Sequence, residues 1–176
     1  MPKDMEGIDL AVLSPGVPVD APFVKAMAEH HIKIWGEIEL AYHYAKGVLA
    51  AITGTNGNTT TTALTGEIMK AWCEHVFVVG NIGNSYTQSA LETTDDSVTV
   101  AEISSFQLET IQDFHPHVAA VLNITPDHLN RHHTMECYIN TKKRIFENQD
   151  ESDFTVLNYD DEITRAMAED TRGKVI

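Results

Sequence analysis

Short apolar runs alternate along this chain with longer segments in which apolar residues recur every three or four positions. The runs are rich in the β-branched residues Val and Ile, which favours strands, and the longer segments have the period of a helix. The predicted strands are 9–14, 32–35, 48–53, 76–79, 98–103, 118–125 and 154–158. The predicted helices are 22–30, 38–46, 60–72, 106–114, 135–147 and 162–169. This alternation predicts the α/β fold class, with a mostly parallel sheet and flanking helices.

Both ends of the sequence run close to predicted strands. The chain opens near a strand that leads into Ser14-Pro-Gly, and it closes on Gly173-Lys-Val-Ile, which has the pattern of a strand just beginning. A buried strand cut at that point leaves backbone N–H and C=O groups of its neighbour unpaired. We therefore expect the natural protein to continue beyond this sequence, with a frayed tail as the alternative.

The charge balance narrows the classes of partner. The chain has 176 residues, 43% of them apolar, with 26 acidic against 12 basic side chains and a formal charge of −14. Such a chain repels phosphate backbones and anionic lipid surfaces, so neither nucleic acid nor a membrane is an expected partner. An anionic ligand such as a nucleotide needs a local positive site, supplied by a helix N-terminus, backbone N–H groups or a metal ion.

Three further features of the sequence favour a cytoplasmic location. The two cysteines, Cys73 and Cys137, form no CxxC pair and have no spacing typical of zinc. The longest apolar runs, 48–52 and 118–122, are too short to span a bilayer. The N-terminus lacks the charged start and apolar stretch of a signal peptide.

The most informative segment runs from an apolar strand through a glycine-bearing turn into a helix. It reads Ile52-Thr-Gly-Thr-Asn-Gly-Asn-Thr-Thr, and the helix after it carries Leu64, Ile68 and Trp72 at intervals of four. Strand, loop and helix in this order are the context of a phosphate-binding loop. The strict Walker pattern is not met, because Ile52 replaces its first glycine and Asn58 its lysine. A Gly/Asn turn capped by threonine stays open as a structural alternative.

This loop resembles the Thr-Gly-Thr-Asn-Gly-Lys-Thr loop of Mur ligases and folylpolyglutamate synthetases, which also lack the first Walker glycine. The resemblance implies an ATP site, with Thr59 as a Mg²⁺ ligand. It also implies that Asn58 stands where the family has a lysine that contacts the β- and γ-phosphates. An amide is shorter and carries no charge, so we expect weaker nucleotide binding and turnover reduced by about 10²–10³ or more. A single-base change of a lysine codon is the alternative origin of Asn58. The implied ATP-binding residues are Gly54, Thr55, Asn56, Gly57, Asn58, Thr59 and Thr60.

A carboxylate follows at the end of another predicted strand. Burying the charge of Glu102 there costs free energy unless the carboxylate is solvated, paired or bound to a metal. Taken alone, the residue could equally be a metal ligand or an acid that caps a helix. Glu102-Ile-Ser-Ser-Phe-Gln-Leu resembles the Glu-x-Ser-Ser-Phe-Gln-Leu motif of the D-glutamate-adding Mur ligases. The resemblance implies that Glu102 holds the Mg²⁺ of ATP and that Ser104 and Gln107 contact substrate.

A histidine lies at the end of the next strand. A histidine here is more often structural or exposed, but Asn123-Ile-Thr-Pro-Asp-His-Leu-Asn-Arg-His resembles the family's Asn-x-Thr-x-Asp-His-Leu-Asp-Arg-His. The resemblance implies that His128 ligates a second Mg²⁺. Asn130 departs from the aspartate usual at its position. His132 and His133 are expected as exposed turn residues.

Lys142 lies at the centre of an apolar helix face. Its neighbours at helical spacing are Met135, Tyr138, Ile139, Ile145 and Phe146. A lysine there either reaches water with its ammonium group or has a lowered pKa that permits modification. In Mur ligases the lysine of a Lys-x-Arg-Ile motif is carbamylated and helps to hold the second Mg²⁺, which implies that role for Lys142.

Two further loops resemble substrate-contacting loops of the family. Gly80-Asn-Ile-Gly is similar to a Gly-Asn-Ile-Gly loop, which implies that Asn81 contacts the muramoyl-alanine substrate. Ser14-Pro15-Gly16 is similar to a loop that meets the uridine diphosphate. A purely structural turn explains either loop almost as well.

Together these resemblances imply an ATP-dependent amide ligase of peptidoglycan synthesis, closest to the members that add D-glutamate to UDP-N-acetylmuramoyl-L-alanine through an acyl phosphate. Residues 1–46 would be the remnant of a UDP-binding domain with its linker, and 47–176 an incomplete ATP-binding domain. A monomer is expected. The alternatives are a non-catalytic nucleotide-binding fragment and a folylpolyglutamate synthetase relative. The Ser-Ser-Phe-Gln-Leu and Gly-Asn-Ile-Gly stretches disfavour the second.

Overall fold

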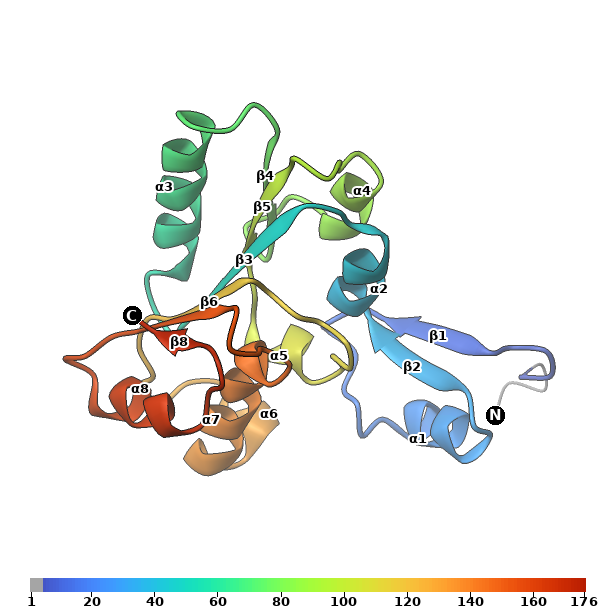
Figure 1. The fold of residues 1–176 in the computed structure, drawn as a ribbon. Coiled ribbons are helices and arrows are strands. Elements are labelled where there is room, and N and C mark those ends of the chain that lie inside the picture. The colour runs from blue at the N-terminus through green and yellow to red at the C-terminus, as the bar shows by residue number, and fades with distance from the viewer. Residues whose placement is uncertain (1–4) are drawn as a thin grey trace.

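A computed structural model describes residues 5–176 of the chain. Residues 1–4, which belong to the first of the two predicted domains, lie outside the described residues. The N-terminal part contains strand β1 (Leu10–Leu13), helix α1 (Pro22–Glu29) and strand β2 (Lys33–Gly36). The two strands pair in parallel, with Leu10 opposite Lys33, and form a small sheet of their own. Figure 1 shows this part set to one side of the larger body.

The larger body is built on a six-stranded sheet in which every pairing is parallel, as the apolar pattern predicted. The strand order is β4-β5-β3-β6-β7-β8, so the chain passes from β3 to the edge strand β4, returns to β5 beside β3, and then crosses to β6 on the other side of β3. The carboxyl ends of β5, β3 and β6 are therefore neighbours at the point where the order reverses, which is where ligands bind in open α/β sheets. The strands are β3 (Val48–Thr53), β4 (Val76–Gly80), β5 (Val98–Glu102), β6 (Val118–Val121), β7 (Phe154–Leu157) and β8 (Lys174–Val175).

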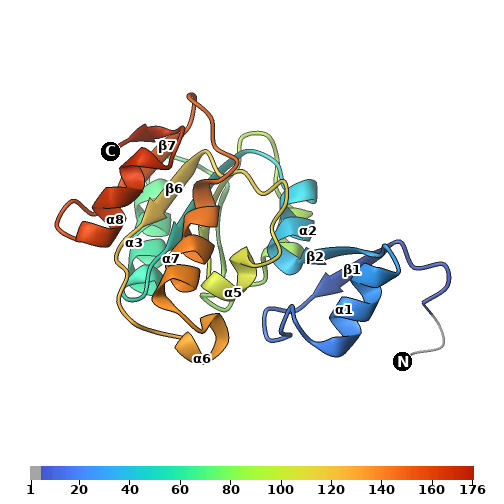
Figure 2. The same ribbon diagram turned by 90° about the horizontal axis from the view of Figure 1, so that it is seen from below.

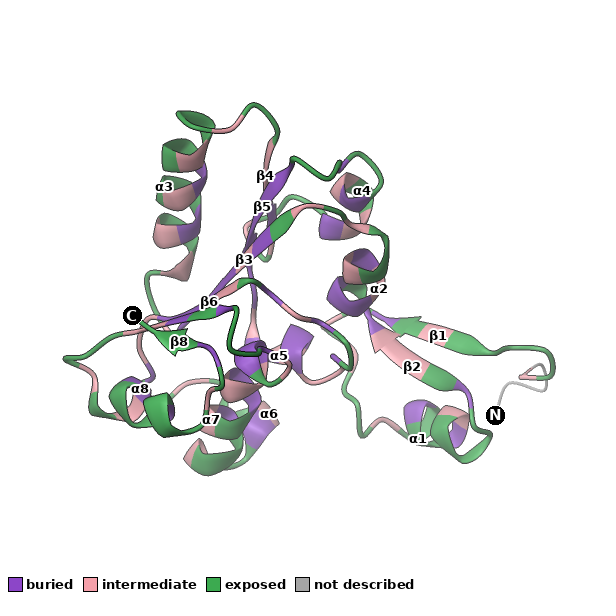
Figure 3. Ribbon diagram, in the orientation of Figure 1, coloured by how far each residue is buried: buried purple, intermediate pink, exposed green. Residues whose placement is uncertain are grey.

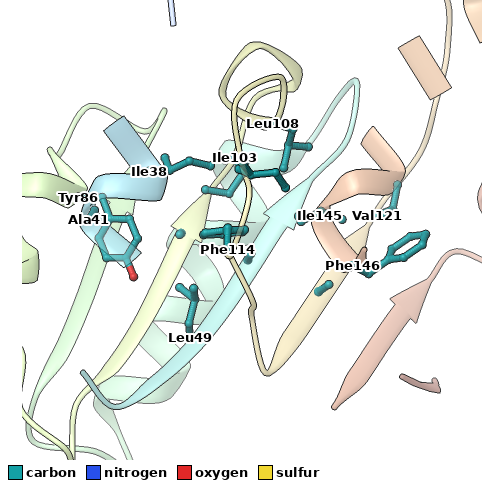
Figure 4. Packing of buried hydrophobic residues seen from close by; sticks show 14 of the residues in the cluster. Ile38, Ala41, Leu49, Tyr86, Ile103, Leu108, Phe114, Val121, Ile145 and Phe146 are labelled. Atoms are coloured by element: carbon teal, nitrogen blue, oxygen red, sulfur yellow. The ribbon is translucent and has the colours of Figure 1, made fainter. Parts of the chain in front are cut away.

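Helices cover the two faces of this sheet unequally (Figures 1 and 2). One face packs against most of the helices and holds the larger core, which includes Ile38, Phe114 and Ile145 (Figure 4). The other face packs against α3 (Asn58–Lys70), through a smaller cluster around Ile52 and Val100. The remaining helices are α2 (Glu37–Tyr44), α4 (Tyr86–Ala90), α5 (Ser105–Leu108), α6 (Leu129–His132), α7 (Met135–Lys143) and α8 (Glu162–Ala166), with 3-10 turns at Arg144–Phe146 and Met167–Glu169. Within residues 5–176, no helix has both the length and the apolar character needed to cross a membrane.

The apolar stripe of the predicted helix 60–72 does not face the sheet. Leu64, Ile68 and Trp72 are 59%, 54% and 84% exposed, and Figure 3 shows the outer side of α3 as exposed. The buried positions of α3 are Thr62 and Gly66. A Cβ at Gly66 would overlap a methyl group of Val78 on β4, so the absence of a side chain lets helix and strand approach closely.

The predicted helix 106–114 was wrong beyond its first turn. Helix α5 ends at Leu108, and two charged side chains, the partly exposed Arg144 and the buried Glu39, satisfy the backbone that follows it. The guanidinium of Arg144 donates to the carbonyl oxygens of Leu108, Glu109 and Ile111 at 2.6–2.9 Å. The Glu39 carboxylate, which is fully buried, accepts the backbone N–H groups of 112, 113 and 114 at 2.8–3.1 Å. Since these partners replace helical hydrogen bonds, the segment needs no regular structure. The strand predicted at 118–125 likewise ends at Val121, where the chain leaves the sheet.

Candidate functional site

The predicted phosphate loop connects the carboxyl end of β3 to the first turn of α3. Gly57 adopts a left-handed conformation with φ of 81°, which a glycine reaches without strain. The backbone N–H groups of Asn58, Thr59 and Thr60 lie in the first turn of the helix, where no helical partner exists. These N–H groups and the helix dipole favour an anion at this end of α3.

Glu102 is at the last position of β5 and is 1% exposed. Its Oε1 atom accepts hydrogen bonds from the side-chain amides of Asn58 at 2.9 Å and Asn81 at 3.0 Å. Its Oε2 atom is buried and has no hydrogen-bond partner among the described residues. An unpaired buried carboxylate oxygen is costly, and a cation removes that cost. The Glu102 carboxylate beside the predicted phosphate loop thus fits Mg²⁺, which prefers oxygen ligands such as carboxylates.

Lys142 lies beneath the phosphate loop and is 2% exposed. Its Nζ donates to Thr53 Oγ1 and to the carbonyl oxygen of Gly54, each at 2.9 Å. Burial lowers the pKa of Lys142 from 10.5 to about 8, against the opposing pull of Asp127 and Glu102. A large fraction of this amine is therefore neutral near pH 8, which is the form that reacts with carbon dioxide to give a carbamate.

The second half of the site comes from the segment that follows β6. His128 is exposed and has a φ of 52°, and its ring lies 4.9 Å from that of Phe106 and 6.4 Å from that of Tyr138. Tyr138 in turn shares a hydrogen bond of 3.1 Å with Thr55 of the phosphate loop. The Tyr138 ring thus connects His128 to the loop.

The expectation that His132 is an exposed turn residue was wrong. Its side chain is 2% exposed, and its Nε2 lies 2.9 Å from Ser105 Oγ at the start of α5. Burial lowers the pKa of His132, partly offset by Glu109. The tertiary packing of α6 against α5 places the ring inside, a contact that no local pattern reveals. His133 is exposed, as expected.

The predicted substrate-contacting residues occupy three places. Ser104 and Gln107 form a reciprocal capping box at the start of α5, and Gln107 also lines a cavity of about 160 Å³ beside the Gly80–Ser85 loop. Ser14 and Pro15 line a small pocket together with Gln107, whereas Gly16 does not line it. Asn81 donates to Glu102 and does not line the cavity.

Two residues that pattern analysis did not single out connect the parts of the site. Asn123 bonds to the phosphate loop through both its backbone and its side chain. Arg131 donates to Glu109 on one side and to the carbonyl oxygen of Val17 on the other, and so joins α6 to the Ser14–Gly16 loop. Both residues belong to the stretch 123–132 that resembles the family's Asn-x-Thr-x-Asp-His-Leu-Asp-Arg-His motif, so that resemblance was the signal in the sequence that could have pointed to them.

Comparison with known proteins identifies the family. The family model described as the Mur ligase middle domain matches residues 52–176. The UDP-N-acetylmuramoylalanine–D-glutamate ligase of Lachnospira eligens is 62% identical over 169 residues, which cover 96% of this chain and 38% of that protein. The enzyme of the same name from Thermoanaerobacter sp. is 52% identical over 171 residues, with 97% and 38% covered.

Solved structures support the fold. A MurF ligase from Thermotoga maritima in complex with ADP aligns with a TM-score of 0.62 at 20% identity, covering 97% of this chain and 48% of the other. The UDP-N-acetylmuramate–alanine ligase MurC of Thermotoga maritima aligns with a TM-score of 0.58 at 24% identity, with 90% and 37% covered. The chain spans well under half the length of the ligases that it matches in sequence. From the matched model and these identities, the chain belongs to the Mur ligase family, and residues 52–176 match the middle domain of that family.

Proposed function

We propose that this chain is the nucleotide-binding core of an ATP-dependent ligase that joins D-glutamate to UDP-N-acetylmuramoyl-L-alanine in cytoplasmic peptidoglycan synthesis. The observation that carries the proposal is the buried, unpaired Oε2 of Glu102 beside a glycine loop at a helix N-terminus. The name shared by relatives that are more than half identical to the chain supplies the substrates. Residues 1–46 and 47–176 would belong to the UDP-binding and ATP-binding domains of a monomer.

In this proposal each part of the site has a separate task. The backbone N–H groups that begin α3 bind the phosphates of ATP, within the loop 54–60. Thr59 and Glu102 would hold the Mg²⁺ of the nucleotide, and His128 with a carbamylated Lys142 would hold a second. When bound, the metal ions neutralise charge on the phosphoryl group that passes to the substrate carboxylate. The D-glutamate amine then attacks the acyl phosphate, and inorganic phosphate leaves.

The substrate would lie on the side of Glu102 that faces the N-terminal part of the chain. The cavity next to Gly80, Gly83 and Gln107 opens between the end of β4 and helix α2. Ser14 and Pro15 approach Gln107 from the other part of the chain. We assign the muramoyl-alanine end of the substrate to this cavity, with Ser104 and Asn81 nearby, and the uridine diphosphate to the Ser14–Gly16 loop.

Asn58 favours a second candidate, a nucleotide-binding module with little or no turnover. Its amide hydrogen-bonds to Glu102 and brings no positive charge to the phosphates. The loss of one donor to developing charge typically lowers turnover by about 10²–10³. The rest of the ligase is also needed to close over ATP, so we expect the chain by itself to bind nucleotide without efficient catalysis.

The test is calorimetric titration of ATP–Mg²⁺ into the chain and into its Asn58→Lys variant at matched salt and pH. We expect binding at least about tenfold tighter in the variant, because an ammonium group beside the phosphates adds a charge-assisted bond. An Asn140→Lys variant, at an exposed position of α7, adds the same charge elsewhere and should leave the affinity unchanged. Absence of binding by both the chain and Asn58→Lys would contradict the proposal.

A further inference from the structure

Asn123 lies just beyond the end of β6 and hydrogen-bonds to the phosphate loop with both polar atoms of its side chain. Its Oδ1 accepts the backbone N–H groups of Thr55 at 3.1 Å and Asn56 at 2.9 Å. Its Nδ2 donates to the carbonyl oxygen of Asn56 at 2.9 Å. The backbone carbonyl of Asn123 also accepts from the Thr55 N–H, at 3.0 Å. One side chain therefore satisfies most of the polar backbone of two consecutive loop residues.

Thr125 extends this contact in the same direction. Its backbone N–H donates to Thr55 Oγ1 at 3.0 Å, and its carbonyl oxygen accepts from the same hydroxyl at 3.2 Å. The Thr55 hydroxyl also meets Tyr138. The segment 123–125 and the loop residues Thr55 and Asn56 thus form one hydrogen-bonded unit across the ends of β3 and β6.

This arrangement divides the N–H groups of the loop into two sets. Those of Thr55 and Asn56 are bound to Asn123, whereas those of Asn58 and Thr59 have no acceptor among residues 5–176. Of these four N–H groups, only those of Asn58 and Thr59 can receive a phosphate without a rearrangement of the loop. A loop that is ordered before the ligand arrives binds it more tightly, because less conformational entropy is lost on binding.

We propose that Asn123 is the positioning residue of the phosphate loop, which holds Thr55 and Asn56 so that the N–H groups beginning at Asn58 are presented to the nucleotide. This inference rests on the proposed function, which identifies the ligand of the loop as a nucleotide. The hydrogen bonds of Asn123 can nevertheless be tested without any ligand. His128 follows Asn123 by five residues in the chain, so the same contact holds the start of the segment that carries His128 against the loop.

The first experiment is amide hydrogen exchange by NMR on the ligand-free chain. In Asn123→Ala, the Asn56 amide loses its acceptor, so we expect its exchange to accelerate at least about tenfold, whereas the Thr55 amide keeps the backbone carbonyl of residue 123 and should accelerate less. Asn158→Ala is the matched control, since Asn158 follows the next strand and its Nδ2 donates to the carbonyl oxygen of Leu122 at 3.0 Å. That variant should leave the two loop amides unchanged.

The second experiment is ATP–Mg²⁺ titration of the same variants in an Asn58→Lys background. We expect Asn123→Ala to weaken binding about tenfold, with Asn158→Ala unchanged. Asn123→Asp keeps the two acceptor contacts, so the loop amides should stay protected while its charge weakens binding of the phosphates. Protection of the Asn56 amide that persists in Asn123→Ala, or equal effects in Asn123→Ala and Asn158→Ala, would overturn the assignment. If Asn123→Ala loses amide protection but none of the proteins binds ATP–Mg²⁺, the role of Asn123 in ordering the loop would stand and the proposed function would be rejected.

Discussion

The buried amine of Lys142 makes the stability of this chain depend on pH in a calculable way. The folded-state pKa is about 8 and the ordinary value 10.5, with burial as the cause. Between these two values the unfolded chain binds more protons at this lysine than the folded chain, so stability rises with pH across that window. Below it the protonated lysine costs the fold about 3 kcal/mol, at about 1.4 kcal/mol for each pKa unit. Since the side chain is 2% exposed, solvent screening is small.

The perturbation is Lys142→Met, which keeps the length of the side chain and removes the titration. Urea unfolding of both proteins would be measured at intervals from pH 7.5 to pH 9.5 in buffer free of carbon dioxide, which would otherwise modify the neutral amine. Over that range we expect the free energy of unfolding of the natural chain to rise by about 2 kcal/mol relative to the variant. The measurement ends at pH 9.5 because burial raises the pKa of Tyr86 and Tyr138, whose ionisation weakens the fold at higher pH.

The difference between the two proteins removes contributions from other titrating groups. A difference that stays flat across the pH range would refute the reasoning, since it would show that the Lys142 amine has the same pKa in both states. A difference that falls with pH would mean that a partner stabilises the charged amine by more than burial destabilises it. Either result would contradict the inference that the Lys142 amine is neutral enough near pH 8 to react readily with carbon dioxide.

Two other substitutions test contacts that hold the site in place. Glu39→Gln should lower the free energy of unfolding by about 3 kcal/mol in urea titration, because a neutral amide group then faces three backbone N–H donors. The control is Glu37→Gln, at an exposed position, which should change the free energy of unfolding by less than about 0.5 kcal/mol. Gly80→Ala should lower the free energy of unfolding by about 3 kcal/mol, since φ is 95° and a Cβ would overlap the carbonyl oxygen of Glu102. Gly83→Ala, with φ of 106° but open space around the glycine, should lower it by only about 1 kcal/mol. Equal costs within either pair would contradict the corresponding contact.

Local pattern was a reliable guide to the strands and to most helices of this protein. The helix predicted at 135–147 is present as α7 and the 3-10 turn that continues it, with Tyr138, Lys142 and Phe146 on one face as predicted. Of the two alternatives for Lys142, the structure shows the buried one. Periodicity alone did not reveal where α5 ends. Its continuation is replaced by contacts from Glu39 and Arg144, which are distant in sequence, and such contacts leave no signature in the segment itself.

Periodicity also did not indicate the orientation of α3. Leu64, Ile68 and Trp72 formed the strongest apolar repeat of the predicted helix, yet the sheet packs against Thr62 and Gly66. The reason is steric, since β4 approaches so closely at Gly66 that a larger side chain on that face would meet Val78. Apolar periodicity identifies a helix, but the shape of the neighbouring strand decides which face is inside.

The sequence by itself determined the fold class, the strand and helix order, and the family, because strand and helix periods and contiguous motifs are local properties of the chain. It also placed Asn58, Glu102, His128 and Lys142 as site candidates at the ends of strands or on a helix face. Only the tertiary structure decided that Asn58 bonds to Glu102, that His132 is buried, and that Asn123 holds the phosphate loop. These facts depend on which strand ends become neighbours when the sheet forms, and non-local strand order is not encoded in any one segment.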